Sequence, residues 1–244
     1  GGVGGVGAPS GDYRWGQGWC LRSAAFNWQG LFDDALTIAD RAREAAVAND
    51  WSTVLAKATR LQGYAEQQRG NLSRSLDCYE GSLELYEELG DDKGRALALN
   101  GLGEVARLRG DNEKSIEHNT EALRLFEALD HDIGVSTCLR GLGVVKQHRN
   151  DLSGAADLYE RALALYEKTG NLYGVATCLN DLAVLYCTQA RYGEAEPLLK
   201  RSLAIYEKAL GPWHPDVATS LNNLAVLYDN QGRYGEAEPL LKRA

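Results

Sequence analysis

Four polar residues recur at one fixed spacing. Arg60, Asn100, Arg140 and Asn180 follow each other at intervals of forty residues, and Asn222 comes 42 residues after Asn180. An Asn side chain offers a hydrogen-bond donor and an acceptor, which suits the main chain of an extended peptide. An Arg guanidinium is a planar fork that suits a carboxylate. The series therefore predicts a binding surface.

Other polar residues share the spacing, since Arg107 and Gln147 are forty residues apart and Asp181 and Asn223 follow two of the asparagines directly. The predicted groove comprises Arg60, Asn100, Arg107, Arg140, Gln147, Asn180, Asp181, Asn222 and Asn223. We expect the three arginines to accept an acidic part of a partner and the asparagines to hold its main chain. In the alternative interpretation these side chains are only solvated polar residues on an empty face.

Catalytic and cofactor chemistry finds no support in the sequence. The segment GGVGGVG at 1–7 contains GxGxxG, but nucleotide binding by that motif requires a preceding strand, so a flexible lead over 1–11 is expected. The four histidines show no metal-ligand spacing, and no nucleophile is paired with a base. His148 falls on the groove side or at a solvated helix end, and His214 is expected to be structural. We predict no enzyme activity, no cofactor and no metal.

The composition restricts which class of partner the protein can bind and which cellular compartment it can occupy. The formal net charge of −8 disfavours nucleic acid and anionic membranes. No apolar run approaches the roughly 18 residues that cross a bilayer. The five cysteines are an odd number without a CxxC pair, which favours buried thiols in a reducing compartment. A cytoplasmic protein with a protein or peptide partner is predicted.

The elements that must position the polar series are helices joined by tight turns. Gly or Asn followed by Asp or Asn occurs on a grid of twenty residues, at 70–71, 90–91, 110–111, 150–151 and 170–171. Gly and Asn tolerate the left-handed conformation that ends a helix, and Asp or Asn caps the next one. The grid predicts helices of about 15–17 residues in hairpins of forty.

Segments forty residues apart also superimpose in sequence. Leucine pairs at i, i+3 form one buried stripe, followed by a small residue and by a second small residue twelve positions later. The pairs are Leu99/Leu102, Leu139/Leu142, Leu179/Leu182 and Leu221/Leu224, and the small residues are Gly103/Ser115, Gly143/Ala155, Ala183/Ala195 and Ala225/Ala237, with Gly63/Ser75 before them. Two helices with small facing residues can cross closely.

This pattern resembles the tetratricopeptide repeat (TPR) family, with Gln62, Ala106, Asn119 and Lys146 as departures at normally large or aromatic positions. Residues 211–244 are similar to kinesin light chain-type repeats. The central units resemble Pins-type adaptors and the sensor arrays of bacterial signal-transduction ATPases. The resemblance implies an all-α fold, an α-solenoid of antiparallel hairpins in a right-handed superhelix, whose first helices line a concave face. The expected units are 12–50, 51–90, 91–130, 131–170, 171–212 and a truncated 213–244.

The resemblance implies a non-catalytic scaffold that recognises an extended segment, as the sensor or adaptor part of a larger signalling protein. The alternative is a self-associating array that organises an oligomer. The phrase RYGEAEPLLKR, at 191–201 and again at 233–243, opens the second helix of two units. The chain stops inside the second copy of that helix, so we expect further repeats after it, or another copy packed against this end.

Overall fold

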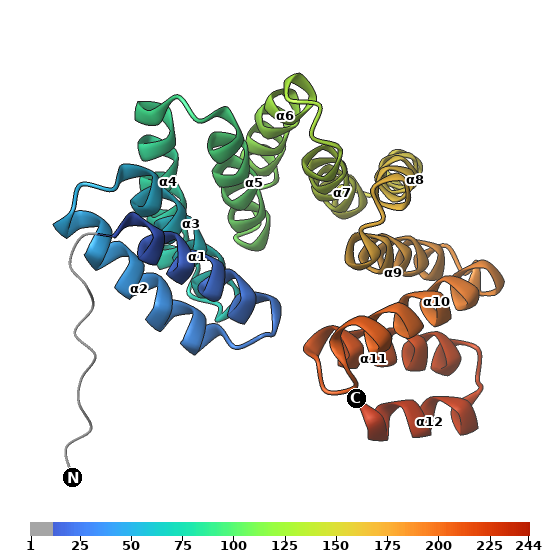
Figure 1. Ribbon diagram of the computed structural model, residues 1–244. Helices are drawn as coiled ribbons and strands as arrows, with labels where there is room; N and C mark the ends of the chain where they lie inside the picture. Colours follow the sequence, from blue (N-terminus) through green and yellow to red (C-terminus); the bar gives the residue numbers. More distant parts are fainter. Residues whose placement is uncertain (1–11) are drawn as a thin grey trace, which may run out of the picture. The chain divides into compact units, whose positions relative to one another are not determined.

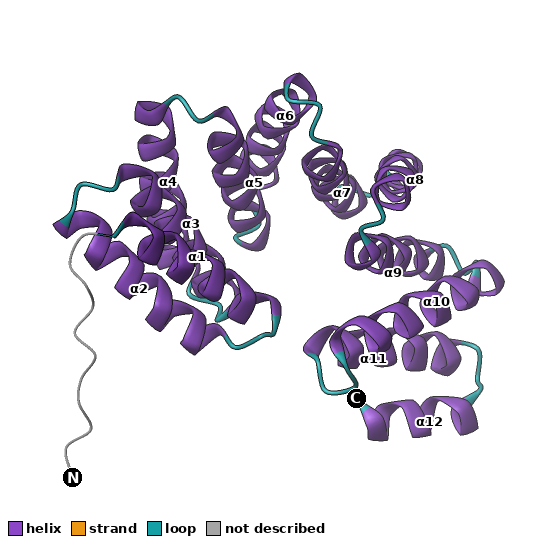
Figure 2. Ribbon diagram, viewed as in Figure 1, coloured by secondary structure: helices purple, strands orange, loops and turns teal. Residues whose placement is uncertain are grey.

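The computed structural model describes residues 12–244, in which helices and short loops alternate and no strand is present (Figures 1 and 2). The lead predicted over 1–11 lies outside the described residues. The helices are α1 (Tyr13–Trp28), α2 (Phe32–Ala48), α3 (Ser52–Gln68), α4 (Leu72–Leu89), α5 (Asp92–Leu108), α6 (Asn112–Ala128), α7 (Asp132–His148), α8 (Leu152–Thr169), α9 (Leu172–Thr188), α10 (Tyr192–Leu210), α11 (Pro215–Asn230) and α12 (Tyr234–Arg243). The all-α prediction is confirmed.

The described residues divide into two compact units, with the boundary between residues 98 and 99. In the first unit, α3 packs against α1, α2 and α4. In the second, each helix from α6 to α12 packs against the next one, and α9 also contacts α7 and α11. The first helices of successive hairpins therefore contact each other directly, as they do between neighbouring repeats of a solenoid.

A residue in the left-handed conformation follows nearly every helix. Gly70, Gly90, Gly110, Asn150 and Gly170, the turn residues of the predicted grid, all have positive φ. Three turns that the sequence signal did not reveal use other residues in the same conformation: Asp50, Asp130 and Ala190. Each turn on the twenty-residue grid therefore requires a residue with positive φ. Glycine or asparagine fills most of these positions, and aspartate or alanine fills the others.

Side chains cap most helix starts on the grid. The carboxylates or amide oxygens of Asp111, Asp151 and Asn171 accept hydrogen bonds from the backbone amide three residues later, at 3.0–3.1 Å. The expected cap at Asn71 is wrong, because Asn71 makes no such bond to α4 and instead donates to Glu66 at 2.6 Å. His131 caps α7 through Nδ1, which accepts from Gly134 at 3.0 Å.

The predicted stripe forms the core, with Leu139, Leu179 and Leu221 almost fully buried. Helices of one hairpin cross closely where small residues meet, as shown by the 2.8 Å hydrogen bond from Ser75 Oγ to the Gly63 carbonyl oxygen. The sequence did not show that each such glycine also faces a larger residue sixteen positions later. A Cβ on Gly143 would lie 2.7 Å from the Tyr159 ring.

Two predicted departures from the pattern keep polar groups satisfied. Gln62 is buried and donates to Asp40, and Lys146 contacts Asp151 at 2.6 Å. All five cysteines are free thiols; Cys20, Cys138 and Cys178 are buried as predicted, whereas Cys78 and Cys187 are only half-buried. Over residues 12–244 no helix is both long and apolar enough to cross a membrane.

Candidate functional site

The second unit brings the predicted polar series together on its first helices. Arg140 of α7 contacts Asp181 of α9, with 3.2 Å between Nη1 and Oδ2. Asn223 of α11 donates from Nδ2 to Oδ1 of Asn180 on α9 at 2.9 Å. We call these four residues the polar ladder. Each of its contacts joins the first helices of two successive hairpins.

The polar ladder continues into α5 as a chain of charges. The guanidinium of Arg107 forms a two-pronged pair with the carboxylate of Glu104, with 2.8 Å from Nε to Oε2. Burial alone would raise the pKa of Glu104, but Arg107 and then Arg140 outweigh it, so this pKa is lowered. Burial likewise opposes the charge of Arg140, yet Asp181 and Glu104 hold its pKa above the ordinary value. These arginines are thus already balanced by carboxylates of the chain.

The remaining predicted residues have different surroundings. Asn100 donates to Asn119 Oδ1 at 2.9 Å, and Gln147 accepts from the Tyr159 hydroxyl at 2.9 Å, so both are tied to second helices. Asn222 is exposed on α11. Arg60 belongs to the first unit, where its Nε is buried without a hydrogen-bond partner and its charge lies near the Tyr86 hydroxyl.

The Asn180–Asn223 contact leaves unused hydrogen-bonding capacity. Since Nδ2 of Asn223 is bonded to Oδ1 of Asn180, the Nδ2 of Asn180 and the Oδ1 of Asn223 remain for other partners. One is a donor and the other an acceptor. A peptide group carries one acceptor and one donor, so the pair can engage the main chain of a bound segment without giving up its own bond.

Directly beside this pair lies a hollow of about 250 Å³ between α9 and α11, with α10 behind it. Val184 and Val226 lie one helical turn beyond Asn180 and Asn223, so the hollow continues the same face. We call it the apolar hollow; it is lined by Val184, Cys187, Thr188, Leu199, Asn223, Val226 and Asn230. Val226 is 55% exposed. A solvent-facing valine beside a concavity can contact an apolar side chain of a partner.

Sequence reasoning missed the apolar hollow and Glu104, although one signal could have shown both. The positions equivalent to Glu104 in later hairpins are Val144, Val184 and Val226. A residue-by-residue comparison at the repeat spacing would have separated a charged end at α5 from an apolar end at α9 and α11. The prediction followed polar residues alone and therefore passed over the valines.

A model of the tetratricopeptide repeat family matches residues 53–128, 94–168 and 174–244, which together are more than half of the chain. The chain belongs to the tetratricopeptide repeat family. The repeats of about forty residues and the α-solenoid fold are those that the sequence predicted. No curated protein matches this TPR sequence.

Several solved structures share this fold. A Rap protein complexed with competence and sporulation factor has a TM-score of 0.71 and 16% identity, over 92% of this chain and 72% of that one. A putative kinesin light chain of Podosopora anserina, with nearly identical TPR-like repeats, has a TM-score of 0.55 and 20% identity, over 77% and 92%.

A signal transduction ATPase with numerous domains from Pyrococcus horikoshii carries a TPR sensor. Its TM-score is 0.63 at 17% identity, over 96% of this chain and 36% of that one. At such identities the likeness is one of fold. The predicted resemblance to kinesin light chain-type repeats and to ATPase sensor arrays is confirmed at that level, and the resemblance to Pins-type adaptors stays a prediction.

Proposed function

We propose that this TPR chain is a non-catalytic scaffold that binds an extended protein or peptide segment along α7, α9 and α11. The observation that carries the proposal is the Asn180–Asn223 pair, which keeps one donor and one acceptor unused beside the apolar hollow. The main chain of the segment would bond the two amides. An apolar side chain next to that peptide group would occupy the apolar hollow.

The ion pairs that the central arginines already make limit how strongly they can bind an acidic partner. An acidic residue of the partner would share Arg140 with Asp181 and Glu104, which already stabilise its charge. We therefore expect the acidic part of the segment to tune specificity, with affinity coming mainly from the asparagines and the hollow. A role as the sensor or adaptor part of a larger cytoplasmic signalling protein fits the structures with which the fold is shared, since one is bound to competence and sporulation factor and another carries a TPR sensor.

Peptide display on the full chain tests the proposal. Selected peptides should bind Asn180→Ala/Asn223→Ala at least tenfold more weakly than the original chain, since two charge-neutral hydrogen bonds of about 1 kcal/mol each are lost. Asn222→Ala is the matched control, because Asn222 lies on the same helix but is exposed outside the ladder. Equal affinity of the double variant and the control for every selected peptide would refute binding at this face.

Self-association is the second candidate, and exposed apolar residues of α12 favour it. Tyr234 and Leu241 of that helix are 67% and 55% exposed. A second copy packed on α12 would cover them. Light scattering decides the matter: a dimer mass that survives dilution, and that Leu241→Glu converts to the monomer mass, would establish an assembly role. A monomer at every concentration would remove this alternative.

A further inference from the structure

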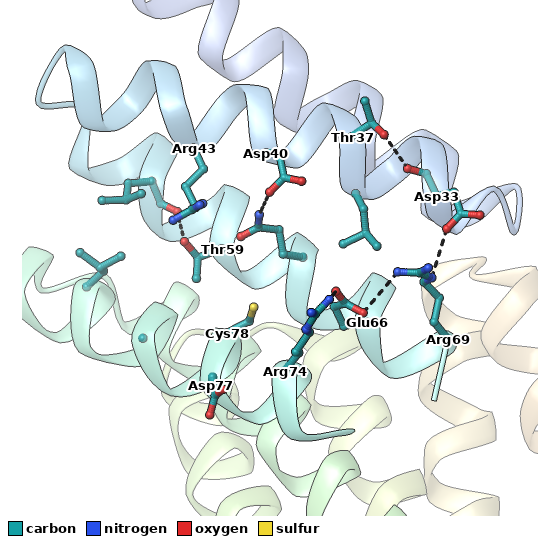
Figure 3. Close-up of a pocket in the computed structure, with 15 residues that line it drawn as sticks. Asp33, Thr37, Asp40, Arg43, Thr59, Glu66, Arg69, Arg74, Asp77 and Cys78 are labelled. Carbon is teal, nitrogen blue, oxygen red and sulfur yellow. Dashed lines mark hydrogen bonds and ion pairs between the residues drawn. The ribbon is translucent and has the colours of Figure 1, made fainter. Parts of the chain in front are cut away.

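A solvent-open cavity of the first unit lies on a different face of α3 from Arg60. It has a volume of about 710 Å³ and is lined by residues of α2, α3 and α4. The α3 residues that line it include Leu55, Thr59, Gln62 and Glu66, which share one face at helical spacing. Figure 3 shows Arg43 and Asp40 reaching into it from α2, and the Cys78 sulfur directed at the same space from α4.

Two substitutions relative to the later hairpins account for this space. The positions equivalent to Arg43 are occupied by leucine: Leu83, Leu123, Leu163 and Leu203. Leu123, for example, packs against the core cluster built by α7, α8 and α9. The positions equivalent to Gly81 carry Glu121, Arg161 and Arg201, whereas a Cβ on Gly81 would meet nothing within 4 Å. A filling leucine and a long side chain are thus both absent from this cavity.

One end of the cavity is closed by ion pairs. Arg69 lies 3.1 Å from Asp33 and 3.6 Å from Glu66, and Arg74 lies 3.6 Å from the other oxygen of Glu66. Beside them, one carboxylate oxygen of Asp40 accepts a hydrogen bond from Gln62. These charges satisfy each other, so this end is a wall that fixes the shape of the cavity.

The rest of the cavity combines a cation, Arg43, that no carboxylate pairs with, and apolar lining residues. Among the described residues Arg43, labelled in Figure 3, has no hydrogen bond or ion pair. Leu55 and Leu85 belong to the lining of the same cavity. Burial raises the pKa of the Cys78 thiol to about 11, so Cys78 is a neutral neighbour. Asp40, one helical turn before Arg43 on α2, keeps its second carboxylate oxygen for another donor.

We propose that this cavity binds a small zwitterionic molecule of the apolar amino-acid or short-peptide class. Its carboxylate pairs with the Arg43 fork, and its ammonium group bonds the unused oxygen of Asp40. Its aliphatic part covers Leu55 and Leu85. The volume lies in the range of known small-molecule sites and has room for a free amino acid or a short peptide. This site is separate from the proposed segment-binding face, which lies in the second unit.

Calorimetric titration of the full chain with L-leucine and with the dipeptide Leu-Leu separates the two sources of the ligand. At least one probe should bind at or below millimolar concentration. Leucinamide and N-acetylleucine each lack one of the two charges, and each should bind at least tenfold more weakly than L-leucine; the amidated and acetylated dipeptides serve the same purpose for Leu-Leu.

Arg43→Leu should abolish binding and should also fold, because leucine occupies this position in the later hairpins. Arg43→Lys should retain part of the affinity, since it keeps the charge and loses the fork. The control is Arg41→Leu, the same change on the same helix outside the cavity, which should bind as the original chain does. The proposal is overturned if neither zwitterion binds, if Arg43→Leu binds like the control, or if removing the carboxylate leaves affinity unchanged.

Discussion

At the level of single residues, the stability of the turns depends more on backbone conformation than on side-chain contacts. Ala190 adopts φ 56 between α9 and α10, a conformation that glycine adopts freely and that costs an alanine about 1 kcal/mol. Gly110 adopts φ 81 at the turn between α5 and α6. The same conformation is therefore strained in one turn and relaxed in the other.

Ala190→Gly should raise the free energy of unfolding by about 0.5–1 kcal/mol, because it relieves this strain at a small cost in chain entropy. Gly110→Ala should lower it by about 1 kcal/mol for the converse reason. Urea denaturation of the two variants measures both changes. Stabilisation by the alanine at 110, or destabilisation by the glycine at 190, would contradict the conformational argument.

At the level of helices, the close crossings are enforced by matched pairs of residues. The amide of Asn119 fills the space beside Gly103, where a Cβ would lie 2.3 Å from its Nδ2. It also accepts the hydrogen bond from Asn100 and donates to the Ser115 carbonyl oxygen at 2.8 Å. The departure from a large apolar residue at 119 is thus compensated by polar partners around it.

Gly103→Ala should destabilise the protein by about 1–3 kcal/mol, because the methyl group overlaps an amide that two hydrogen bonds hold in place. Gly193→Ala is the matched control on α10, where a Cβ would meet nothing within 4 Å. Thermal unfolding compares them. Equal melting temperatures of the two variants would show that the crossing adapts to the added atom.

The last helices depend on one carboxylate. Glu196 of α10 lies 2.7 Å from both Lys200 and Arg233 and accepts from the Tyr228 hydroxyl at 3.1 Å. Hydrogen bonds from Arg233 and Lys200 lower the pKa of Glu196 to about 2. Because the folded pKa lies below the unfolded one, this stabilisation is present above about pH 4.5 and is lost as the pH falls toward 2.

Glu196→Gln should therefore reduce stability at pH 7 by about 1–2 kcal/mol, a value discounted because Lys200 and Arg233 are partly exposed. The difference from the original chain should shrink as the pH falls from about 5 to 2. Glu238→Gln, in an exposed pair with Lys242, is the control. A difference that stays constant over this range would rule out the titration of Glu196 as its cause.

At the level of the whole molecule, the helix contacts within each described unit join near neighbours along the chain. In the second unit α9 reaches α7, α8, α10 and α11 and no helix beyond them. Stability in such a structure is a sum of local terms, so a defect should stay local.

Gly143→Ala, which places a Cβ 2.7 Å from the Tyr159 ring, should accelerate amide hydrogen exchange most in α7 and α8. Exchange in α11 should change less, because α11 contacts neither α7 nor α8. Mass spectrometry of peptide fragments after exchange gives the profile. Uniform acceleration from α6 to α12 would indicate a single cooperative unit in place of a local response.

Much of this architecture could be predicted from the sequence because the same local signals recur in each repeat. The stripe through Leu139, Leu179 and Leu221 and the turn glycines are local signals at a fixed period. The polar ladder could be predicted only in part, because a period places Arg140 and Asp181 on one face but does not say that they neutralise each other. The cavity beside Arg43 was missed because its signal is a pair of departures from the repeat, Arg43 in place of leucine and Gly81 in place of a long side chain. The two positions lie on different helices, and only the structure shows that they border one space.

The fit between Asn119, Gly103 and Asn100 has a further consequence for how such a chain can change over generations. These three positions lie on both helices of one hairpin, and Gly141 of the next hairpin also approaches the Asn119 amide. Recombination that exchanged α6 alone for a copy with tyrosine at this place would have to accommodate a ring beside the amide of Asn100. Gene conversion that copies a whole hairpin keeps the partners together, so the hairpin is the smallest segment that can be inherited as a piece.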